Sequence, residues 1–484
     1  MFSRDGPRRK GSCDFVEPEI VQTFSLKNRW LDSGKTRLDA SSYAAEVIAS
    51  RVLIEKLQAR GIPVSKVSDH AERVFWPGRF KRSYTRHGVG FPFLMPRDVI
   101  MFLPEPRKFI SHSPKNLAVE KNWLLITRSG SVGRCLIVGD TLKRFVLSDD
   151  LIRVVPRKNT ALDYLYVFLN TWVGQALLTT KQYGATVKHL EPHQVADVQV
   201  PQMEGIRAEL GTMIRRVHRL RNRAQELMLL AQRKLYSEMA LPTLDQQAIG
   251  FLGDEDEQMS QCFETRVGSL NGRLNASYHN PMLLKIESYL SKLGYGVRPL
   301  DEMILSMHVP PRFKRPYTNN ALHGVRYLRP SDLLLIKHFE RRYLVKSFPD
   351  CGLYTLVKGD ILVVTDGTIG WASIVTAHTA KWYGSNNFAR IKTVKGLDKG
   401  YLLAYLLCPY GQFQLKREIY GGVIDHLTED QIRGVRVPIP PMDVQHSIGK
   451  LVIGAHRNKD EANLIEEKAI LLLENEMVRV AQRN

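Results

Sequence analysis

Two stretches of the chain carry apolar residues in alternating steps of four and three. Steps that average about 3.5 residues are typical of a coiled-coil seam, which needs a second seam as its partner. Polar Asn458 interrupts the second stretch, at a position that often fixes helix register. We therefore predict long helices at 204–240 and 442–484 that pack on each other. The apolar residues are Ile206, Leu210, Met213, Val217, Leu220, Ala224, Leu227 and Ala231, then Val444, Ile448, Leu451, Ala455, Ala462, Ile465, Ala469 and Leu472.

The chain is also a tandem repeat. Six short motifs return in the same order, and matched positions differ by 233 to 237 residues. Self-similarity at one long period indicates a repeated structural unit, here residues 37–240 and 273–482. The matched pairs are Arg37–Ser41 with Arg273–Ser277, Arg79–Thr85 with Arg312–Thr318, His87–Val89 with His323–Val325, Gly130–Gly133 with Gly367–Gly370, Ser148–Arg153 with Ser385–Arg390, and Tyr183–Pro201 with Tyr420–Pro438.

Both copies predict the same series of elements. A short helix comes first, at 43–59 and 282–293, and β-like runs at 123–127 and 360–365 then enter Gly-rich turns. Each copy continues with one helical stretch, a strand that ends at a proline, and the long helix. The helical stretches and strands are 162–183, 198–201, 399–420 and 435–438. The expected fold class is α+β, with two tandem mixed α/β domains and two long helices.

Charge narrows the range of partners. The chain has 484 residues with 69 Lys plus Arg against 49 Asp plus Glu, a net charge of +20. A protein this basic attracts polyanions, and nucleic acid is the first choice. No apolar 20-mer favours a membrane, residues 1–10 lack the apolar core of a secretory signal, and the five cysteines are scattered. We expect a cytoplasmic protein with reduced thiols and no zinc module.

With these motifs the chain resembles the specificity subunits of type I restriction–modification systems. The resemblance covers about residues 37–482 and rests on the duplicated Arg-Leu-Asp/Asn-Ala-Ser-x-Tyr opening, the SGSVGR and DGTIGW turns, the YG-x4-HL-x3-Q-x3-V-x-VP runs and the two long helices. It implies two target-recognition domains separated by helices that form an antiparallel coiled coil. The divisions it implies are an N-terminal extension (1–36), recognition domain 1 (37–203), a central helix (204–240), a linker (241–272), recognition domain 2 (273–441) and a C-terminal helix (442–484).

The resemblance also implies a mechanism. Each recognition domain would read one half of a bipartite DNA site, and the helices would set the distance between the halves. Because the copies differ in sequence, we expect the site to be asymmetric. The expected partners are double-stranded DNA, two methyltransferase subunits and, indirectly, restriction subunits. We expect no cofactor and no metal.

The Arg-Phe-Lys-Arg-x-Tyr-Thr segments are the predicted DNA contacts. Cations alternate there with aromatic rings, a pattern that suits phosphates and bases. The structural alternative is a half-buried strand whose phenylalanine faces a core and whose charges are merely solvated. The predicted residues are Arg79, Lys81, Arg82, Tyr84 and Arg86 in copy one, and Arg312, Lys314, Arg315 and Tyr317 in copy two.

Domains that read different bases should differ at the residues that contact those bases. The motifs that are identical in both copies are therefore expected to contact the DNA backbone. The dissimilar stretches 107–115 and 337–346 are the predicted base readers. The Gly-rich turns lack the Lys-Ser/Thr of a phosphate-binding loop, so a tight turn is favoured, although Ser131 and Thr368 remain possible phosphate contacts. The predicted base readers are Lys108, His112 and the adjoining Asn116 in copy one, and Arg341, Arg342 and Tyr343 in copy two.

Catalytic hypotheses find little support in the residues. Asn280-Pro281-Met282 lacks the second proline and aromatic of an adenine methyltransferase, and no Asp/Glu-x-Lys follows Pro349-Asp350 at nuclease spacing. His189 and His426 match each other without other metal ligands, so a structural role is favoured. We expect no intrinsic catalysis. The alternatives are a DNA-recognition subunit of a related phage-defence or combined restriction–modification enzyme, a methyltransferase-fused enzyme, or an RNA-binding coiled-coil scaffold.

Overall fold

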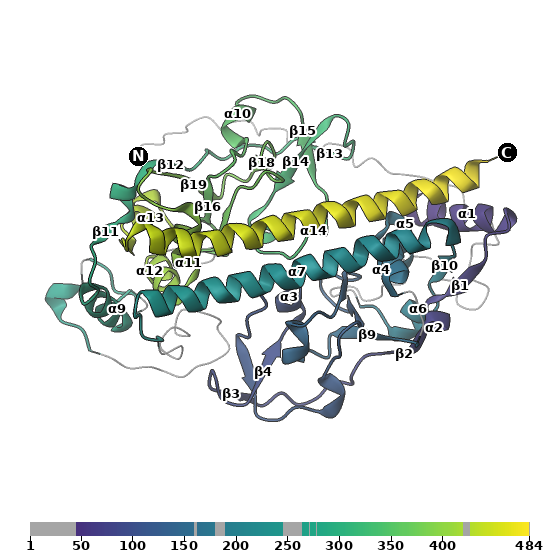
Figure 1. Ribbon diagram of the computed structural model, residues 1–484, viewed down its shortest axis with the longest axis horizontal. Coiled ribbons are helices and arrows are strands. Elements are labelled where there is room, and N and C mark those ends of the chain that lie inside the picture. Colours follow the sequence, from purple (N-terminus) through teal and green to yellow (C-terminus); the bar gives the residue numbers. More distant parts are fainter. Residues whose placement is uncertain are drawn as a thin grey trace, which may run out of the picture.

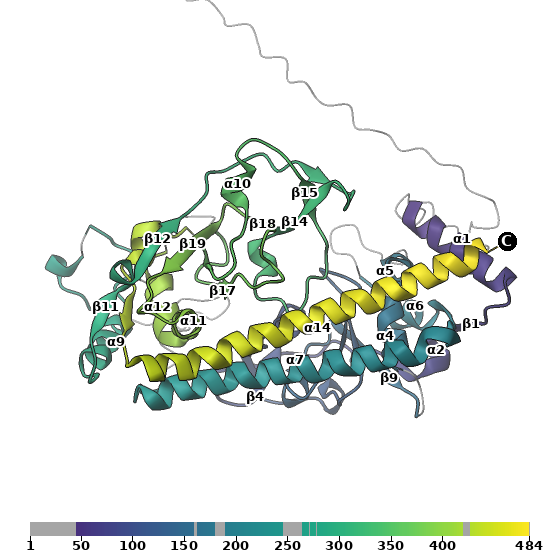
Figure 2. The ribbon, with the colours of Figure 1, turned by 45° about the horizontal axis from the view of Figure 1, so that its top comes forward.

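The fold is organised around two long helices, α7 (Glu204–Glu238) and α14 (Met442–Gln482). It was analysed as a computed structural model, and the structure describes residues 45–158, 162–179, 189–244, 264–270, 272–276, 278–419 and 426–483. The two helices lie side by side and run in opposite directions (Figures 1 and 2). Arg216 pairs with Glu461, while Leu227, further along α7, lies beside Gly454, earlier in α14. The helix pair is therefore antiparallel.

The first domain lies on one side of the helix pair (Figure 1). Its helices are α1 (Ala45–Ala59), α2 (Val67–His70), α3 (Pro96–Val99), α4 (Leu162–Asn170), α5 (Trp172–Thr179) and α6 (Pro192–Ala196). Its strands are β1 (Val64–Lys66), β2 (Ala71–Phe75), β3 (Tyr84–Thr85), β4 (Phe91–Leu94), β5 (Lys108–Ile110), β6 (Leu124–Thr127), β7 (Cys135–Ile137), β8 (Val146–Leu147), β9 (Leu151–Pro156) and β10 (Gln199–Pro201). They form a larger sheet in the order β2-β9-β6-β7, a smaller sheet in the order β3-β5-β4-β8, and the pair β1-β10.

The second domain lies on the opposite side and repeats this topology. Its helices are α9 (Met282–Ser291), α10 (Cys351–Tyr354), α11 (Lys399–Leu407), α12 (Pro409–Arg417) and α13 (Glu429–Arg433). Its strands are β11 (Val297–Pro299), β12 (Ile304–His308), β13 (Tyr317–Thr318), β14 (Gly324–Leu328), β15 (Tyr343–Val345), β16 (Ile361–Val364), β17 (Ala372–Ile374), β18 (Tyr383–Gly384), β19 (Phe388–Thr393) and β20 (Arg436–Pro438). The sheet orders are β12-β19-β16-β17, β13-β15-β14-β18 and β11-β20. The predicted fold class and the packing of the two long helices are confirmed.

Several predicted features lie outside the described residues. They are the 1–36 extension, Arg37–Ser41, Tyr183-Gly184, Ser277, Tyr420-Gly421 and the acidic part of the 241–272 linker.

The helical stretch predicted in each copy is in fact two helices joined by an elbow. The break falls at Thr171 between α4 and α5, and at Cys408 between α11 and α12. In the second copy Pro409 begins the new helix, because proline cannot donate the hydrogen bond that would continue the old one. A glycine lies just inside each new helix, where a Cβ would come within 2.1 Å of the Phe168 carbonyl oxygen at Gly174 and 2.3 Å of the Tyr405 carbonyl oxygen at Gly411.

The two domains also touch each other directly. Phe102 N donates to the Leu334 carbonyl at 2.7 Å, and Ile336 N donates to the Ile100 carbonyl at 3.0 Å. Between these bonds Met101 and Leu335, which occupy corresponding positions in the two copies, form an antiparallel bridge. Buried side chains from both domains share one apolar cluster around this point. The two copies are therefore related by an approximate two-fold rotation that passes through this bridge and across the helix pair.

The helix seam follows the predicted period but uses different residues at every second position. Leu210, Val217, Ala224, Ala231, Ile448, Ala455, Ala462 and Ala469 are buried as expected. The positions between them are Ile214, Arg221, Met228 and Leu235 in α7, and Val452, Lys459, Glu466 and Leu473 in α14. The predicted apolar neighbours Ile206, Met213, Leu220, Leu227, Val444, Leu451, Ile465 and Leu472 are half-buried and pack against the cores of the two domains. Asn458, the predicted polar seam residue, lies beside the seam, half-buried.

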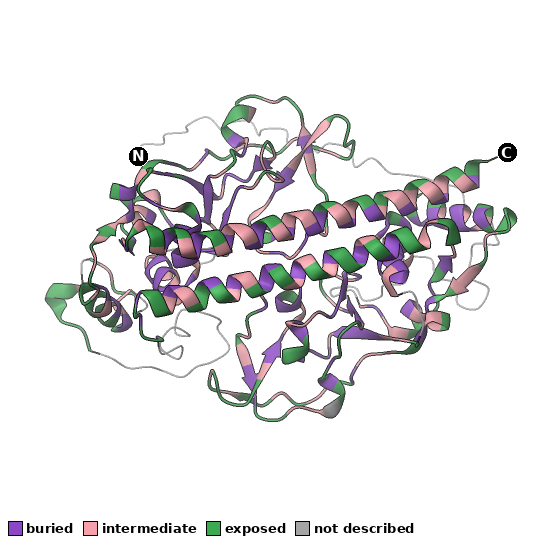
Figure 3. Ribbon diagram, in the orientation of Figure 1, coloured by how far each residue is buried: buried purple, intermediate pink, exposed green. Residues whose placement is uncertain are grey.

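Buried stretches alternate with exposed ones along both helices (Figure 3), and the buried residues of the helices belong to the same apolar clusters as those of the domains. Each long helix has apolar residues on two faces, one toward the other helix and one toward the domains. The apolar pattern alone therefore did not distinguish these two faces.

A buried cluster of charges lies in the seam. Glu466 accepts hydrogen bonds from Arg221 at 2.6 Å and from Lys337 of the second domain at 3.1 Å. Tyr166 of α4 also donates to Glu466, and Asn170 accepts from Lys337 at 2.8 Å. Burial alone would raise the pKa of Glu466, but the two cations outweigh it and hold the pKa well below its usual range. One carboxylate thus joins both long helices and both domains.

The approximate two-fold rotation does not repeat this cluster. At the related position Met228 stands where Glu466 does, Leu103 where Lys337 does, and Leu403 where Tyr166 does. Lys459, which corresponds to Arg221, is buried with its ammonium 4.9 Å from the centre of the Phe102 ring. The group of Glu466 with two cations therefore occurs on one side of the interface, and this distinguishes the two copies from each other.

Among the helices in the described ranges, none has a stretch apolar and long enough to cross a bilayer.

We predict that the stability of the fold depends strongly on the carboxylate of Glu466. Glu466→Met leaves Arg221 and Lys337 buried without a counter-charge, and we expect a loss of about 3–5 kcal/mol in unfolding free energy. The triple variant Arg221→Met, Lys337→Leu, Glu466→Met replaces the whole charged group by apolar side chains and should recover most of that loss. Urea unfolding followed by circular dichroism measures both.

The matched control is Glu226→Met on the exposed face of α7, where the carboxylate is 61% exposed and pairs with the exposed Arg223. We expect a change below about 0.5 kcal/mol. Equal unfolding midpoints for the wild type and Glu466→Met would contradict the role assigned to the cluster.

Candidate nucleic-acid interface

The repeated basic segments lead into the edge strands of the two smaller sheets. Residues 79–85 end in β3 and residues 312–318 end in β13. In each sheet the edge strand pairs with β5 or β15, which also pairs with β4 or β14. The strands β3 and β13 lie on opposite sides of the helix pair, away from it (Figure 1). The two segments are thus presented at opposite sides of the molecule.

The phenylalanines of the segments are part of small local cores. Phe80 meets Phe93 edge to face, with ring centroids 6.2 Å apart. Phe313 packs between Tyr354 and Phe348, at centroid distances of 3.9 and 5.5 Å. These rings anchor the segment to its sheet, as the structural alternative for this motif expected.

One arginine of each segment is held by a partner within its own domain. Arg82 donates to the carboxylate of Asp149 at 2.5 Å, and that side chain is only 3% exposed. Arg315 donates to Asn386, which corresponds to Asp149, at 2.9 Å and to the Tyr327 hydroxyl at 2.8 Å. Both arginines therefore fasten the segment to the turn at 148–150 or 385–387. A phosphate would have to compete with these bonds.

The other cations of the segments point into solvent. Arg79, Lys81 and Arg86 are exposed in the first domain, and Arg312 and Lys314 in the second. Their tyrosine neighbours are also accessible, Tyr84 at 38% and Tyr317 at 51%. DNA contact by these side chains stays a prediction, and their exposure is compatible with it.

A second repeated arginine was aligned in the sequence but given no role. Arg153 is fully buried and donates to four backbone carbonyls, those of Ser148, Leu151, Leu117 and Leu147, at 2.7–3.3 Å.

Its counterpart Arg390 donates to the carbonyls of Tyr354 and Thr355, both at 2.9 Å. Burial lowers the pKa of each guanidinium to about 10. Arg153 thus ties β9 of the larger sheet to β8 of the smaller sheet, and Arg390 ties β19 to the end of α10. Their recurrence at matched positions was the available signal.

The two stretches predicted to read bases have different surroundings. Lys108 lies with its ammonium 4.9 Å from the Tyr84 ring centre, and His112 and Asn116 are exposed nearby in sequence. In the second domain Arg341 and Arg342 are exposed, with Arg342 bonded to Glu340 at 3.0 Å, and Tyr343 opens β15. Lys337, the first residue of that stretch, is buried in the charge cluster and faces the helices rather than solvent.

In the loops between β3 and β4 and between β13 and β14, the matched His-Gly-Val motifs predicted the wrong pairs of equivalent residues. Because β4 Phe91 pairs with Ile110 and β14 Val325 pairs with Leu344, Gly90 corresponds to Gly324. A Cβ at either glycine would clash with the neighbouring strand, at 2.5 and 2.6 Å. The matched His-Gly-Val letters are therefore not equivalent in space, and the second loop is one residue longer.

The Gly-rich turns connect β6 to β7 and β16 to β17. Gly130, Gly133, Gly367 and Gly370 all have positive φ, between 71° and 85°. Gln175 donates to the Gly133 carbonyl at 3.0 Å and Gln412 to the Gly370 carbonyl at 2.8 Å, so each turn is packed on α5 or α12. Ser131 is exposed and Thr368 is half-buried.

The paired histidines bridge to the strand ends before these turns. His189 forms a bridge with Ser129, and His426 forms one with Asp366 and also bonds to its carboxylate. Within the described ranges, no group of three or more His, Cys, Asp or Glu side chains is arranged to hold a metal ion.

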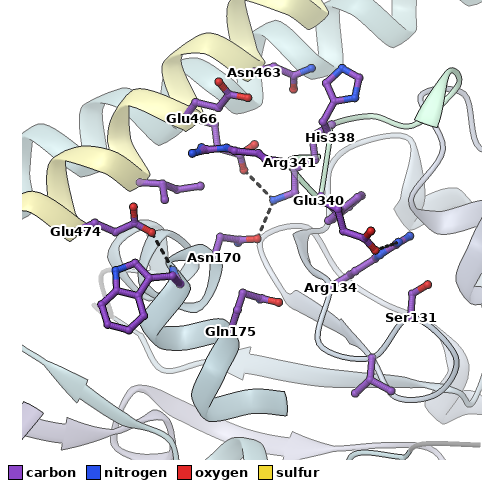
Figure 4. A pocket seen from close by; sticks show the side chains of 16 residues that line it. Ser131, Arg134, Asn170, Gln175, His338, Glu340, Arg341, Asn463, Glu466 and Glu474 are labelled. Atoms are coloured by element: carbon purple, nitrogen blue, oxygen red, sulfur yellow. Dashed lines mark hydrogen bonds and ion pairs between the residues drawn. The ribbon is translucent and has the colours of Figure 1, made fainter. Parts of the chain in front are cut away.

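A cavity of about 360 Å³ lies where the two domains and α14 meet. Ser131, Arg134 and Trp172 reach it from the first domain, and Glu340 and Arg341 from the second (Figure 4). Arg134 and Glu340 span it at 3.4 Å, and the Glu466 cluster forms one wall. Thus Ser131 and Arg341, both predicted DNA contacts, line an inter-domain cavity rather than the outer sheets.

Comparisons with known proteins point to one family. Residues 312–454 match the family model described as type I restriction modification DNA specificity domain. This segment spans most of the second domain and the first turns of α14. The first domain has the same sheet orders in the same chain order, so it has the same fold by internal repetition. No curated protein matches the sequence.

Three solved structures resemble the chain, each covering 87% of it and 97% of their own length. One is the S subunit of a type I restriction-modification system from M. genitalium, 12% identical with a TM-score of 0.34. Another is an HsdS subunit from Thermoanaerobacter tengcongensis, 13% identical with a TM-score of 0.27. The third, 12% identical with a TM-score of 0.28, is described as showing complex assembly and conformational transition of the type I R-M system.

The exposed cations predict a non-specific electrostatic contribution to DNA binding. The double variant Arg79→Ala, Lys81→Ala should weaken binding to every duplex by a similar factor. Because two phosphate contacts are removed, the slope of log K against log salt should become shallower by about 1.8. Titration of the full chain with a fluorescent duplex at several salt concentrations measures this slope.

The control variant Lys56→Ala, Arg60→Ala removes the same charge at the exposed end of α1. It should leave the slope nearly unchanged. A changed preference among duplex sequences in the Arg79, Lys81 variant, with an unchanged slope, would instead assign these residues to base reading.

Proposed function

Because this chain is a DNA specificity subunit of the type I restriction–modification family, we propose that its two domains read the two halves of one bipartite, asymmetric DNA site. The observation that carries the proposal is the duplication itself. Two domains of one topology stand on opposite sides of a rigid antiparallel helix pair. Two reading units on a rigid spacer favour two half-sites at a fixed separation.

The asymmetry of the proposed site follows from differences between the domains. The loops that follow the edge strands β3 and β13 differ in length and in sequence, Arg86–Gly90 against Asn319–Gly324. The dissimilar stretches at 107–115 and 337–346 add further differences. A common scaffold with different loops favours two unlike half-sites.

We further propose that methyltransferase subunits bind the chain along its helices and domains, and that restriction subunits join through them. Exposed leucines on the long helices support this. Leu464 is 51% and Leu471 is 44% exposed on α14, and seven residues apart they lie on one face. Leu230 of α7 is 40% exposed. On this proposal the chain has no reaction of its own, its partners carry the chemistry, and it works in the cytoplasm with the DNA.

The test is to express the chain in a bacterial host together with the methyltransferase encoded beside it and to map methylated adenines across the genome. We expect methylation at one split motif whose halves differ, and no such motif when the chain is omitted. Copurification of the two proteins without a methylated motif would overturn the proposed function and favour a different defence complex.

A further inference from the structure

In each domain, the loop that follows the edge strand of the smaller sheet exposes one large aliphatic side chain. Val89 is 55% exposed in the loop from β3 to β4, and Leu322 is 78% exposed in the loop from β13 to β14. Each is the fourth residue after a threonine that ends the edge strand, Thr85 or Thr318. Counted from the edge strand, the two side chains occupy the same position in loops of different sequence and length, which indicates a shared use.

Both side chains are held on ordered loops. Val89 N donates to the Arg86 carbonyl at 3.0 Å, and the Thr85 hydroxyl donates to the Val89 carbonyl at 2.5 Å. In the second domain Leu322 N donates to the Asn320 side chain at 2.9 Å. Each loop holds its aliphatic side chain in solvent instead of packing it against its own domain. Such a side chain can contact an apolar group of a partner.

The surroundings of both tips are basic. Residues 79–91 contain four Arg or Lys and no Asp or Glu, and residues 312–324 contain three and none. Arg82 is paired with Asp149, so three of the four cations in the first domain have no such carboxylate partner among the described residues. An apolar tip among cations suits a polyanion that also has an apolar feature, which a DNA base edge provides. A flat membrane is disfavoured, because the two tip sheets lie on opposite sides of the helix pair and could not reach one surface together (Figures 1 and 2).

The width of the tip indicates which groove of B-DNA it would enter. The loop runs from β3 to β4, which lie on either side of β5, so it spans two strand spacings, about 10 Å. The major groove of B-DNA is about 12 Å wide and the minor groove about 6 Å. The separation between the two strands already exceeds the width of the minor groove, so we assign the tip to the major groove, where the only apolar feature on a base edge is the C5 methyl group of thymine.

We propose that Val89 and Leu322 each contact the C5 methyl group of a thymine in the major groove, one in each half-site. Each contact specifies one T·A pair in its own half of the recognition sequence. This inference rests on the proposed function, because it needs two half-sites read by two domains. The neighbouring residues of the two loops differ, which allows the bases beside the two thymines to differ as well.

The first experiment repeats the methylated-adenine map with Val89→Ala and Leu322→Ala, each in the full chain expressed with its methyltransferase. Val89→Ala should relax the motif at one thymine of one half-site only. Leu322→Ala should relax it at one thymine of the other half. Both side chains are exposed, so neither change disturbs a core.

The second experiment isolates the methyl group. A duplex with the mapped motif is compared with one in which deoxyuridine replaces that thymine, which removes only the C5 methyl. The wild-type complex should bind the uracil duplex about three- to five-fold more weakly, the value for one buried methyl group. The variant of the domain that reads that half should bind the two duplexes equally.

Matched controls are Val357→Ala and Leu305→Ala, whose side chains are 49% and 72% exposed outside the tips. Both should keep the wild-type preference for thymine. The inference is overturned if the tip variants keep that preference, or if they weaken binding to all duplexes equally. If the wild-type chain directs methylation to no motif, the proposed function itself is contradicted. If the wild-type chain gives a motif and the tip variants leave it unchanged, only this inference is contradicted.

Discussion

The arrangement of the whole chain depends on the antiparallel packing of α7 against α14. Each domain contributes to a core at one end of this pair, so neither domain has a position independent of it. Glu466 lies at the point where both helices and both domains meet, and it is bonded to Arg221, Lys337 and Tyr166. A buried carboxylate needs partners from all of these elements at once, so it favours a single relative placement.

The same cluster breaks the symmetry of a duplicated molecule. Two copies of one unit could pack in more than one combination, because their apolar seams are similar. With Met228 and Leu103 at the related positions, only α14 supplies the carboxylate that Arg221 requires. Charged seam residues are a known means of fixing register and partner in coiled coils, at some cost in stability. Here they would also keep the distance between the two domains constant.

Within each domain, buried cations build the scaffold and exposed cations are left for a ligand. Arg153 joins the two sheets of its domain and Arg390 joins β19 to the end of α10, while Arg82 and Arg315 fasten the basic segment to its neighbouring turn. The tip loops then stand on a scaffold that is nearly the same in both domains. Differences in recognition can therefore arise from loop residues without any change in the fold.

The sequence by itself determined the duplication, the order of the elements, the two long helices and the basic character of the exposed segments. These features are local or repetitive, so period, turn residues and matched motifs are enough to reveal them. Only the tertiary structure decided which of two adjacent positions faces the other helix, as with Leu220 and Arg221. It also decided which arginines are exposed, and that Lys337 is buried while Arg79 is not. These outcomes depend on partners far away in the chain, such as Glu466 for Lys337, and no local pattern encodes that contact.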